Sequence, residues 1–486
     1  MNKKIISLVI LSIFSLTSLI FAGEMDKNLK KGFDSIQPMD PYNYCKKLAS
    51  PEFAGRFTGH EGYTSAAKWA AGKFKQWELK PISKGEGYLQ AYPSPYTLID
   101  KAEMTLFQFQ NEDETIAEIP LKAGADFLPM LYSDSGSNKA GFVFAGWGIC
   151  APELGYDDYA GLDVSGKFVL CFRGTPERGN TDFEKHDHHR RRMSTAKEKG
   201  ALGIFYIYPE PIANPNGDWI ENFTPAIISE KTANKIFEEK KYNSADLKKA
   251  LSTYKRPLSF SLKSEINFEV QSRHFPDATG YNIVGYVEGS DPKLKHECLV
   301  YGGHFDHCGL HIGMLFAGAN DNASGSAVVM EIAEAFSKLK KKPKRSVMFI
   351  LFGGEEMGLM GSTYFVEHVP SQFKKVDTMF NFDMVGPGDG TSCGFSANAV
   401  GFKENLEKAD QFVKTLRSTW EIKHVGVRSS DYAPFFLSGT MCASFYSNGP
   451  HLHYHKTGDT IYRINPDMLA DISRIAFISG FYWADR

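Results

Sequence analysis

Histidine and acidic residues follow three apolar runs in the middle of this 486-residue chain. Each run has the length and apolar content of a buried strand in a parallel sheet. Because sites in open α/β sheets form at the carboxyl ends of the strands, we expect these side chains to meet at one sheet edge. A histidine with several carboxylates suits zinc or a similar divalent ion, so the pattern predicts a metal site. The runs and the residues that follow them are 298–302 with His304 and Asp306, 347–352 with Glu355 and Glu356, and 378–382 with Asp383.

A loop and a helical pattern lie between the first two runs. Asp321 opens the segment DNASG, and residues 327–339 then have the apolar spacing of a helix. Two adjacent glutamates at a strand end are explained if one binds a metal and the other accepts protons. Each feature also has a plain structural alternative, since a histidine beside a carboxylate is common in protein cores and glutamates are common in surface loops.

Six motifs, in order along nearly the whole mature chain, closely resemble the M28 family of di-zinc aminopeptidases. The resemblance implies an α/β zinc-exopeptidase fold, with a mixed, largely parallel central sheet flanked by helices and an inserted small β-rich domain. It also implies a zinc-dependent exopeptidase. The motifs are HFDH (304–307), GANDNASG (318–325), GGEEMGLMGS (353–362), NFDMVG (381–386), SSDYAPFF (429–436) and YHKTGDT (454–460).

Matching these motifs to the family implies two metal ions, with zinc expected and cobalt or manganese as substitutes. Asp321 matches the aspartate that bridges the two ions. His304 and Asp383 would complete the first metal position, and Glu356 and His455 the second.

Two positions leave alternatives open. In the last motif we choose His455, four residues before the Asp-Thr pair, with His453 as the alternative. In the first motif the family's H-x-D pattern favours His304, and Asp306 would then hold its other ring nitrogen. His307 and His311 are expected to line the pocket or the surface. The resemblance further implies a cis bond between residues 321 and 322.

The resemblance gives Glu355 the role of general base, which takes a proton from a water between the metals and returns it to the leaving amine. Tyr454 matches a tyrosine that stabilises the oxyanion in several relatives. Its alternative is a packed aromatic with a solvated hydroxyl. Asp431 is expected to orient the site.

Composition supports a globular chain. Hydrophobic residues make up 42% of the chain, enough for a sizeable core, and the net charge of −2 gives no argument for nucleic acid. Lys3 and Lys4 precede an apolar run at 5–21 and the small pair Ala22-Gly23, which is the layout of a secretory signal peptide. We expect export to the periplasm or medium, without stable membrane insertion after cleavage. A retained anchor is the alternative.

Four segments are predicted: a signal peptide at 1–23, peptidase parts at 24–125 and 273–486, and an insert at 126–272. The insert resembles a protease-associated (PA) domain. Its histidine cluster, His186 with His188 and His189, could bind metal, but a solvated loop or first helical turn is the better interpretation. The GRFTG segment at 55–59 resembles a segment of exported M28 enzymes.

The expected activity is removal of the N-terminal residue from peptides. A dipeptidase or carboxypeptidase is the alternative on the same fold, because the metal set would be shared. A non-catalytic binding protein of the receptor type is disfavoured, since such relatives lose ligands and this chain keeps all five and the base. A one-metal glutaminyl cyclase is disfavoured by the insert.

Overall fold

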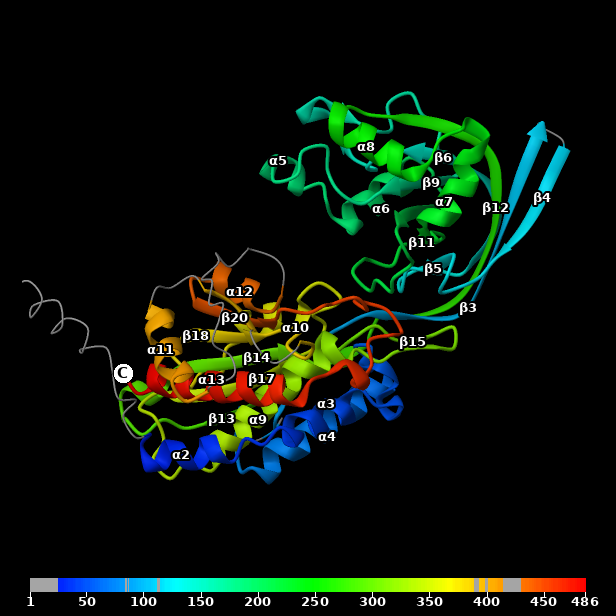
Figure 1. Cartoon of the computed structure of the whole chain (residues 1–486). Helices are drawn as coiled ribbons and strands as arrows, with labels where there is room; N and C mark the ends of the chain where they lie inside the picture. The colour runs from blue at the N-terminus through cyan, green and yellow to red at the C-terminus, as the bar shows by residue number, and fades with distance from the viewer. Residues whose placement is uncertain are drawn as a thin grey trace, which may run out of the picture.

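The computed structural model describes residues 25–83, 85, 87–111, 114–388, 393–397, 401–413 and 430–486. These residues form two bodies, each with its own sheet, joined by the long strands β3 (Tyr96–Asn111) and β12 (Ser259–Phe275) (Figure 1). The predicted signal peptide at 1–23 lies outside the described residues, as do residues 428 and 429. No helix in the described ranges is both long enough and apolar enough to cross a membrane.

The first body holds the motifs on an eight-stranded mixed sheet of order β1-β13-β17-β14-β18-β20-β19, with β2 beside β13. Its elements are α2 (Lys27–Asp34), α3 (Met39–Leu48), η1 (Pro51–Arg56), α4 (Glu61–Gln76), β1 (Lys80–Pro81), β2 (Leu89–Pro93), β13 (Thr279–Val287), η4 (Leu294–His296), β14 (Glu297–His304), β15 (Gly309–His311), β16 (Met314–Phe316), η5 (Ala319–Ser324), α9 (Gly325–Ser337), β17 (Ser346–Phe352), α10 (Met360–Glu367), β18 (Lys375–Phe382), β19 (Cys393–Ala397), α11 (Gly401–Asp410), α12 (Tyr432–Leu437), β20 (Met441–Ser447), η6 (Ile461–Arg463) and α13 (Pro466–Ala484).

Four central strands run parallel, and their register aligns the ends that carry the motifs. Strand β14 pairs with β17 and β18, and β18 pairs with β20, all in parallel. His304 lies opposite Phe352, the last residue of β17. The residues after β14, β17 and β18 therefore emerge at one sheet edge, as the apolar runs predict.

Alternate residues of these strands pack against different helices, as a pleated strand buried on both faces requires. Tyr301 and Phe349 belong to the core cluster that includes α9 and α13. Val300 faces the other way and packs in the cluster with Phe365 of α10 and Phe435 of α12. The sheet is thus covered by helices on both faces, which fixes the edge where the site forms.

The second body has an eight-stranded sheet of order β4-β3-β12-β6-β9-β10-β11-β5. Most of the predicted insert lies in it, and β3 and β4, which precede residue 126, pair into the same sheet. Its remaining elements are β4 (Glu114–Leu121), β5 (Phe127–Pro129), β6 (Gly136–Ala145), β7 (Cys150–Ala151), η2 (Pro152–Leu154), β8 (Tyr156–Asp157), β9 (Phe168–Phe172), α5 (Thr181–Glu184), α6 (His189–Glu198), β10 (Gly203–Tyr208), β11 (Ala226–Ser229), α7 (Glu230–Phe237), η3 (Glu238–Lys240) and α8 (Ser244–Tyr254).

Candidate metal centre

Asp321 lies between two histidines that come from distant parts of the chain. Its Oδ1 is 3.5 Å from Nε2 of His304, at the end of β14. Its Oδ2 is 3.2 Å from Nε2 of His455, in the loop after β20. The peptide bond between Asp321 and Asn322 is cis, as the resemblance implies. One carboxylate therefore presents one oxygen to each histidine, which is the arrangement a bridging ligand needs.

Two further carboxylates complete the two positions. Asp383 Oδ1, just after β18, is 3.5 Å from His304 Nε2. Glu356 Oε2, in the loop after β17, is 2.9 Å from His455 Nε2. The structure thus brings together all five predicted metal ligands.

The donor atoms fit divalent cations. Asp321 Oδ2, Asp383 Oδ1 and His455 Nε2 are buried and, among the described residues, have no hydrogen-bond partner. Buried polar atoms without partners are rare and costly, so their gathering points to a bound group. Sets of His, Asp and Glu atoms here lie within 4.8 Å of one another, including His304 with Asp321 and Glu356. Oxygen and nitrogen donors of this kind suit zinc.

In each imidazole the ring nitrogen that faces away from Asp321 lies beside a backbone carbonyl oxygen. His455 Nδ1 is 2.8 Å from the carbonyl oxygen of Ala213, which can only accept. His304 Nδ1 is 3.3 Å from the carbonyl oxygen of Asp306 and 3.6 Å from its Oδ1. A proton on Nδ1 leaves the Nε2 lone pair free, so both histidines turn a basic nitrogen toward Asp321.

The two adjacent glutamates have different surroundings. Burial raises the pKa of Glu355 well above its usual value, against the opposing effect of His304, and the Glu356 charge raises it further. Burial also acts to raise the pKa of Glu356, but His455 and His307 together hold it well below the usual value. Oε2 of Glu355 lies 3.9 Å from His304 Nε2. Pairs of carboxyls pushed apart in this way are typical of divided acid–base roles.

Asp306 does more than support His304. Its carboxylate accepts hydrogen bonds at 3.3 Å from the backbone N–H groups of both Glu355 and Glu356. It also accepts from the Thr58 hydroxyl at 3.1 Å, and that hydroxyl accepts from Gly354 N–H at 3.1 Å. The GRFTG segment therefore anchors the loop of the two glutamates.

Arg56 of the same segment is fully buried and donates to four carbonyl oxygens. Two of them belong to residues 317 and 318, immediately before the Asp321 segment, and one to Phe305. This guanidinium ties the loop after β14 to the loop that carries the bridging aspartate.

Asp459, four residues after His455, supports the Asp321 segment and was not among the predicted site residues. It is buried, and its carboxylate accepts hydrogen bonds at 2.9 Å from the backbone N–H groups of Asn320 and Asp321. The spacing from His455 to Asp459 is the signal that could have revealed it. The turn between them brings the Asp459 carboxylate to the backbone of Asp321, the predicted bridging ligand.

His307 and His311 do not lie on the surface, as the sequence analysis had allowed, because both are buried. His307 Nδ1 is 2.8 Å from Oε1 of Glu356, the oxygen that does not face His455. Cys308 lies close to this pair, within the 4.8 Å group formed with Glu356 and His455. The contact of His307 with Glu356 was not predicted because sequence spacing does not show which of two neighbouring histidines touches a predicted ligand.

The remaining predicted residues surround this cluster. Asp431 is buried, and burial raises its pKa to about 7, against the opposing effect of His304. The Tyr454 ring stacks on the His455 ring with centroids 3.8 Å apart, and the residue is 47% exposed. His453, the alternative ligand, is absent from the metal-binding groups found among the described residues.

The histidines of the 186–189 cluster have structural partners in the second body. His186 Nε2 is 2.9 Å from Glu153 Oε1, and His189 Nε2 is 2.5 Å from Arg173 Nη1. Asp187 binds the guanidinium groups of Arg173 and Arg192.

Comparisons with known proteins show which proteins this chain resembles. Residues 282–478 match the model of peptidase family M28. Aminopeptidase YwaD of Bacillus subtilis is 27% identical over 361 residues, which cover 71% of this chain and 68% of YwaD.

Two solved structures share the fold over nearly the whole chain. The aminopeptidase from Aneurinibacillus sp. strain AM-1 has a TM-score of 0.64 at 20% identity, covering 94% of this chain and 96% of that one. BSAP, a zinc aminopeptidase from Bacillus subtilis, has a TM-score of 0.61 at 19% identity, covering 93% and 96%. The predicted fold class is confirmed, and the resemblance to peptidase family M28 is borne out over residues 282–478.

Proposed function

We propose that this chain is an exported, zinc-dependent aminopeptidase that removes the N-terminal residue from peptides. The observation that carries the proposal is the position of Asp321, whose two oxygens face two histidines while Glu355 lies beside the same cluster. The predicted enzyme class, a metallo-aminopeptidase, is confirmed by the family match and by relatives named as aminopeptidases.

The ligand set divides into two positions that share Asp321. His304 and Asp383 would hold one cation, and Glu356 and His455 the other. Two such cations would supply Lewis acidity, lowering the pKa of a water molecule and polarising the peptide carbonyl.

Glu355 would transfer a proton during the reaction. Its carboxylate would accept a proton from the attacking water and deliver it to the nitrogen of the leaving amine. The Tyr454 hydroxyl would donate a hydrogen bond to the oxygen that gains negative charge. Asp431, which is fully buried, would orient the groups of the site.

Export is part of the proposal. It is supported by the basic start, the apolar run at 5–21 and the small residues that follow, which together have the layout of a secretory signal. Detection of processed protein outside the cytoplasm of the producing cell would test it, and retention of the unprocessed chain in the cytoplasm would contradict it.

The test of the activity combines metal analysis with a substrate panel. Purified protein should contain two metal ions per chain, and chelation should abolish hydrolysis of amino-acid arylamides until zinc is restored. Free peptides should be cleaved and their N-acetylated counterparts left intact. Equal rates on both would contradict an aminopeptidase, and release of C-terminal residues or cleavage of dipeptides alone would support the alternatives.

A further inference from the structure

A loop of the second body lies against the metal-binding histidine. Residues 209–219, which we call the clamp loop, connect β10 to the segment before β11, and Ala213, Asn214 and Pro215 are buried. Ala213 accepts from His455 Nδ1 at 2.8 Å and donates its backbone N–H to the His455 carbonyl oxygen at 3.0 Å. Two hydrogen bonds thus join the bodies at one metal ligand, across 242 sequence positions.

These bonds control which atom His455 offers to a metal. The Ala213 carbonyl holds the proton on Nδ1, so Nε2 keeps its lone pair and points at Glu356 and Asp321. The acceptor comes from the second body, so a shift of the clamp loop would release the ring.

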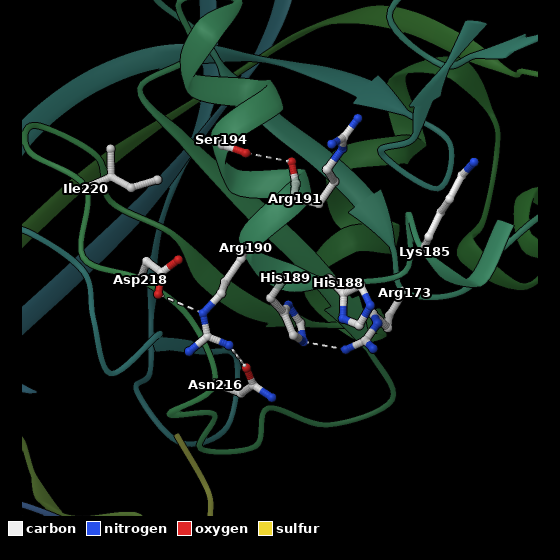
Figure 2. A pocket seen from close by; sticks show the side chains of 10 residues that line it. All are labelled: Arg173, Lys185, His188, His189, Arg190, Arg191, Ser194, Asn216, Asp218 and Ile220. Carbon is white, nitrogen blue, oxygen red and sulfur yellow. Dashed lines mark hydrogen bonds and ion pairs between the residues drawn. The ribbon is translucent and has the colours of Figure 1, made fainter. Parts of the chain in front are cut away.

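Arg190 of α6 holds the clamp loop in place. Figure 2 shows its guanidinium reaching Asp218 and Asn216, where it donates to Asp218 Oδ1 and Asn216 Oδ1, each at 2.7 Å. It also donates to the carbonyl oxygen of Gly217 at 3.2 Å. Three consecutive residues of the loop are therefore tied to one side chain.

The same guanidinium contacts the loop of the two glutamates. Arg190 Nη2 donates to the carbonyl oxygen of Met357, the residue after Glu356, at 2.8 Å. Gly358 follows with a φ of +105°, and a Cβ built there would lie 3.1 Å from Nη1 of Arg190. Arg190 thus links the support of His455 to the loop that carries its partner, Glu356.

His189, next to Arg190, supports the clamp loop from inside the second body. Its Nε2 accepts from the Asn214 amide at 3.0 Å and from Arg173 Nη1 at 2.5 Å, the second of which Figure 2 shows. Asn214 directly follows Ala213, and its own Oδ1 accepts the Asn216 N–H at 2.9 Å. His189 of α6 therefore holds the residue next to Ala213, whose carbonyl oxygen contacts His455.

We propose that the second body supports the second metal position, and that Arg190 is the positioning residue that couples the two. The clamp loop orients His455 through Ala213, and Arg190 keeps that loop in register with Glu356. This inference rests on the proposed function in one respect, that His455 and Glu356 bind a metal.

Replacing Arg190 with methionine keeps an unbranched, flexible stem and removes every donor. Loss of a residue that supports a metal ligand lowers metal affinity by about 10- to 100-fold, and we expect R190M to weaken the second metal by this factor while the first is retained. R190K keeps the charge but cannot serve four acceptors at once, so its loss should be smaller. Excess zinc should restore hydrolysis by R190M.

The matched control is R191M. Arg191 is adjacent and exposed, and no hydrogen bond or ion pair found among the described residues involves its side chain. The second test variant is N216A/D218A, which removes two acceptors from exposed positions on the clamp loop and leaves Arg190 in place. It should reproduce part of the loss even if R190M fails to fold.

The experiment titrates metal-free full-length protein with zinc against a chromophoric chelator, with circular dichroism to check the fold of each variant. A selective loss at the second metal in R190M, or in N216A/D218A where R190M does not fold, supports the proposal. Unchanged affinity in folded variants, or an equal loss in R191M, overturns it. Wild-type protein that binds fewer than two metals would instead overturn the proposed function, so the two failures are distinguishable.

Discussion

Glu355 and Glu356 are adjacent but have different surroundings, and exchanging each for glutamine tests the two roles proposed for them. Glu356 Oε2 is 2.9 Å from His455, and its other oxygen is 2.8 Å from His307, which fits its proposed role as a metal ligand. Glu355 lies 3.9 Å from His304, which already has Asp321 and Asp383 at 3.5 Å. We expect E355Q to keep both metals and to lose turnover, and E356Q to lose one metal.

The size of the loss in E355Q follows from its role. A positioned general base contributes about 10²- to 10⁴-fold, so kcat should fall by this factor, which corresponds to about 2.7–5.4 kcal/mol in the activation free energy. The KM for an arylamide should change much less. The assay measures kcat and KM alongside metal content after desalting, with E356Q treated identically. E355Q with a single bound metal, or an inactive E356Q that keeps both metals at wild-type affinity, would refute the assignment.

Three further substitutions test the supports around the site and the core. D459N puts an NH₂ group in place of the carboxylate oxygen of Asp459 that accepts the Asp321 N–H. This change should weaken zinc binding by about 10-fold or more, measured by chelator competition. H307L removes the donor to Glu356 and should lower the affinity of the second metal by a similar factor, while N-terminal arylamide specificity stays unchanged. Glu331 is buried in α9, where burial raises its pKa to about 9 from 4.5, so the folded chain keeps a proton that the unfolded chain loses. Its contribution to stability is therefore present below about pH 4.5 and is lost as pH rises toward 9, by at most about 1.4 kcal/mol per pH unit. The Tm of E331Q should rise relative to that of the wild type as pH increases over this range. Curves of Tm against pH that stay parallel would contradict this.

The sequence predicts the sheet edge well because parallel pairing leaves little freedom. An apolar run with an acid or histidine after it can be read directly, and the register of β14 with β17 then places His304 opposite Phe352. The boundaries of elements were less exact. For example, β14 extends to include His304, and the helix predicted at 327–339 runs from Gly325 to Ser337. Helix ends depend on local capping and packing that periodicity does not show.

The supports of the ligands were largely beyond the sequence. Asp306 could be predicted for His304 because the two are neighbours in the chain. The Ala213 carbonyl could not be, since every residue has a carbonyl and only the folded chain brings this one to His455. His307 was assigned to the pocket or surface for a related reason. Its hydrogen bond to Glu356 depends on the direction of its side chain, which spacing does not fix.

The contact between Ala213 and His455 has a thermodynamic consequence for the whole molecule. If docking of the clamp loop favours the form of His455 that binds metal, then bound metal must favour docking by the same factor. The second body would then be held to the first by three things together: the strands β3 and β12, the Arg190 bonds to the loop of the glutamates, and the metal itself. The predicted insert would in this way be coupled to the second metal position although it has its own sheet.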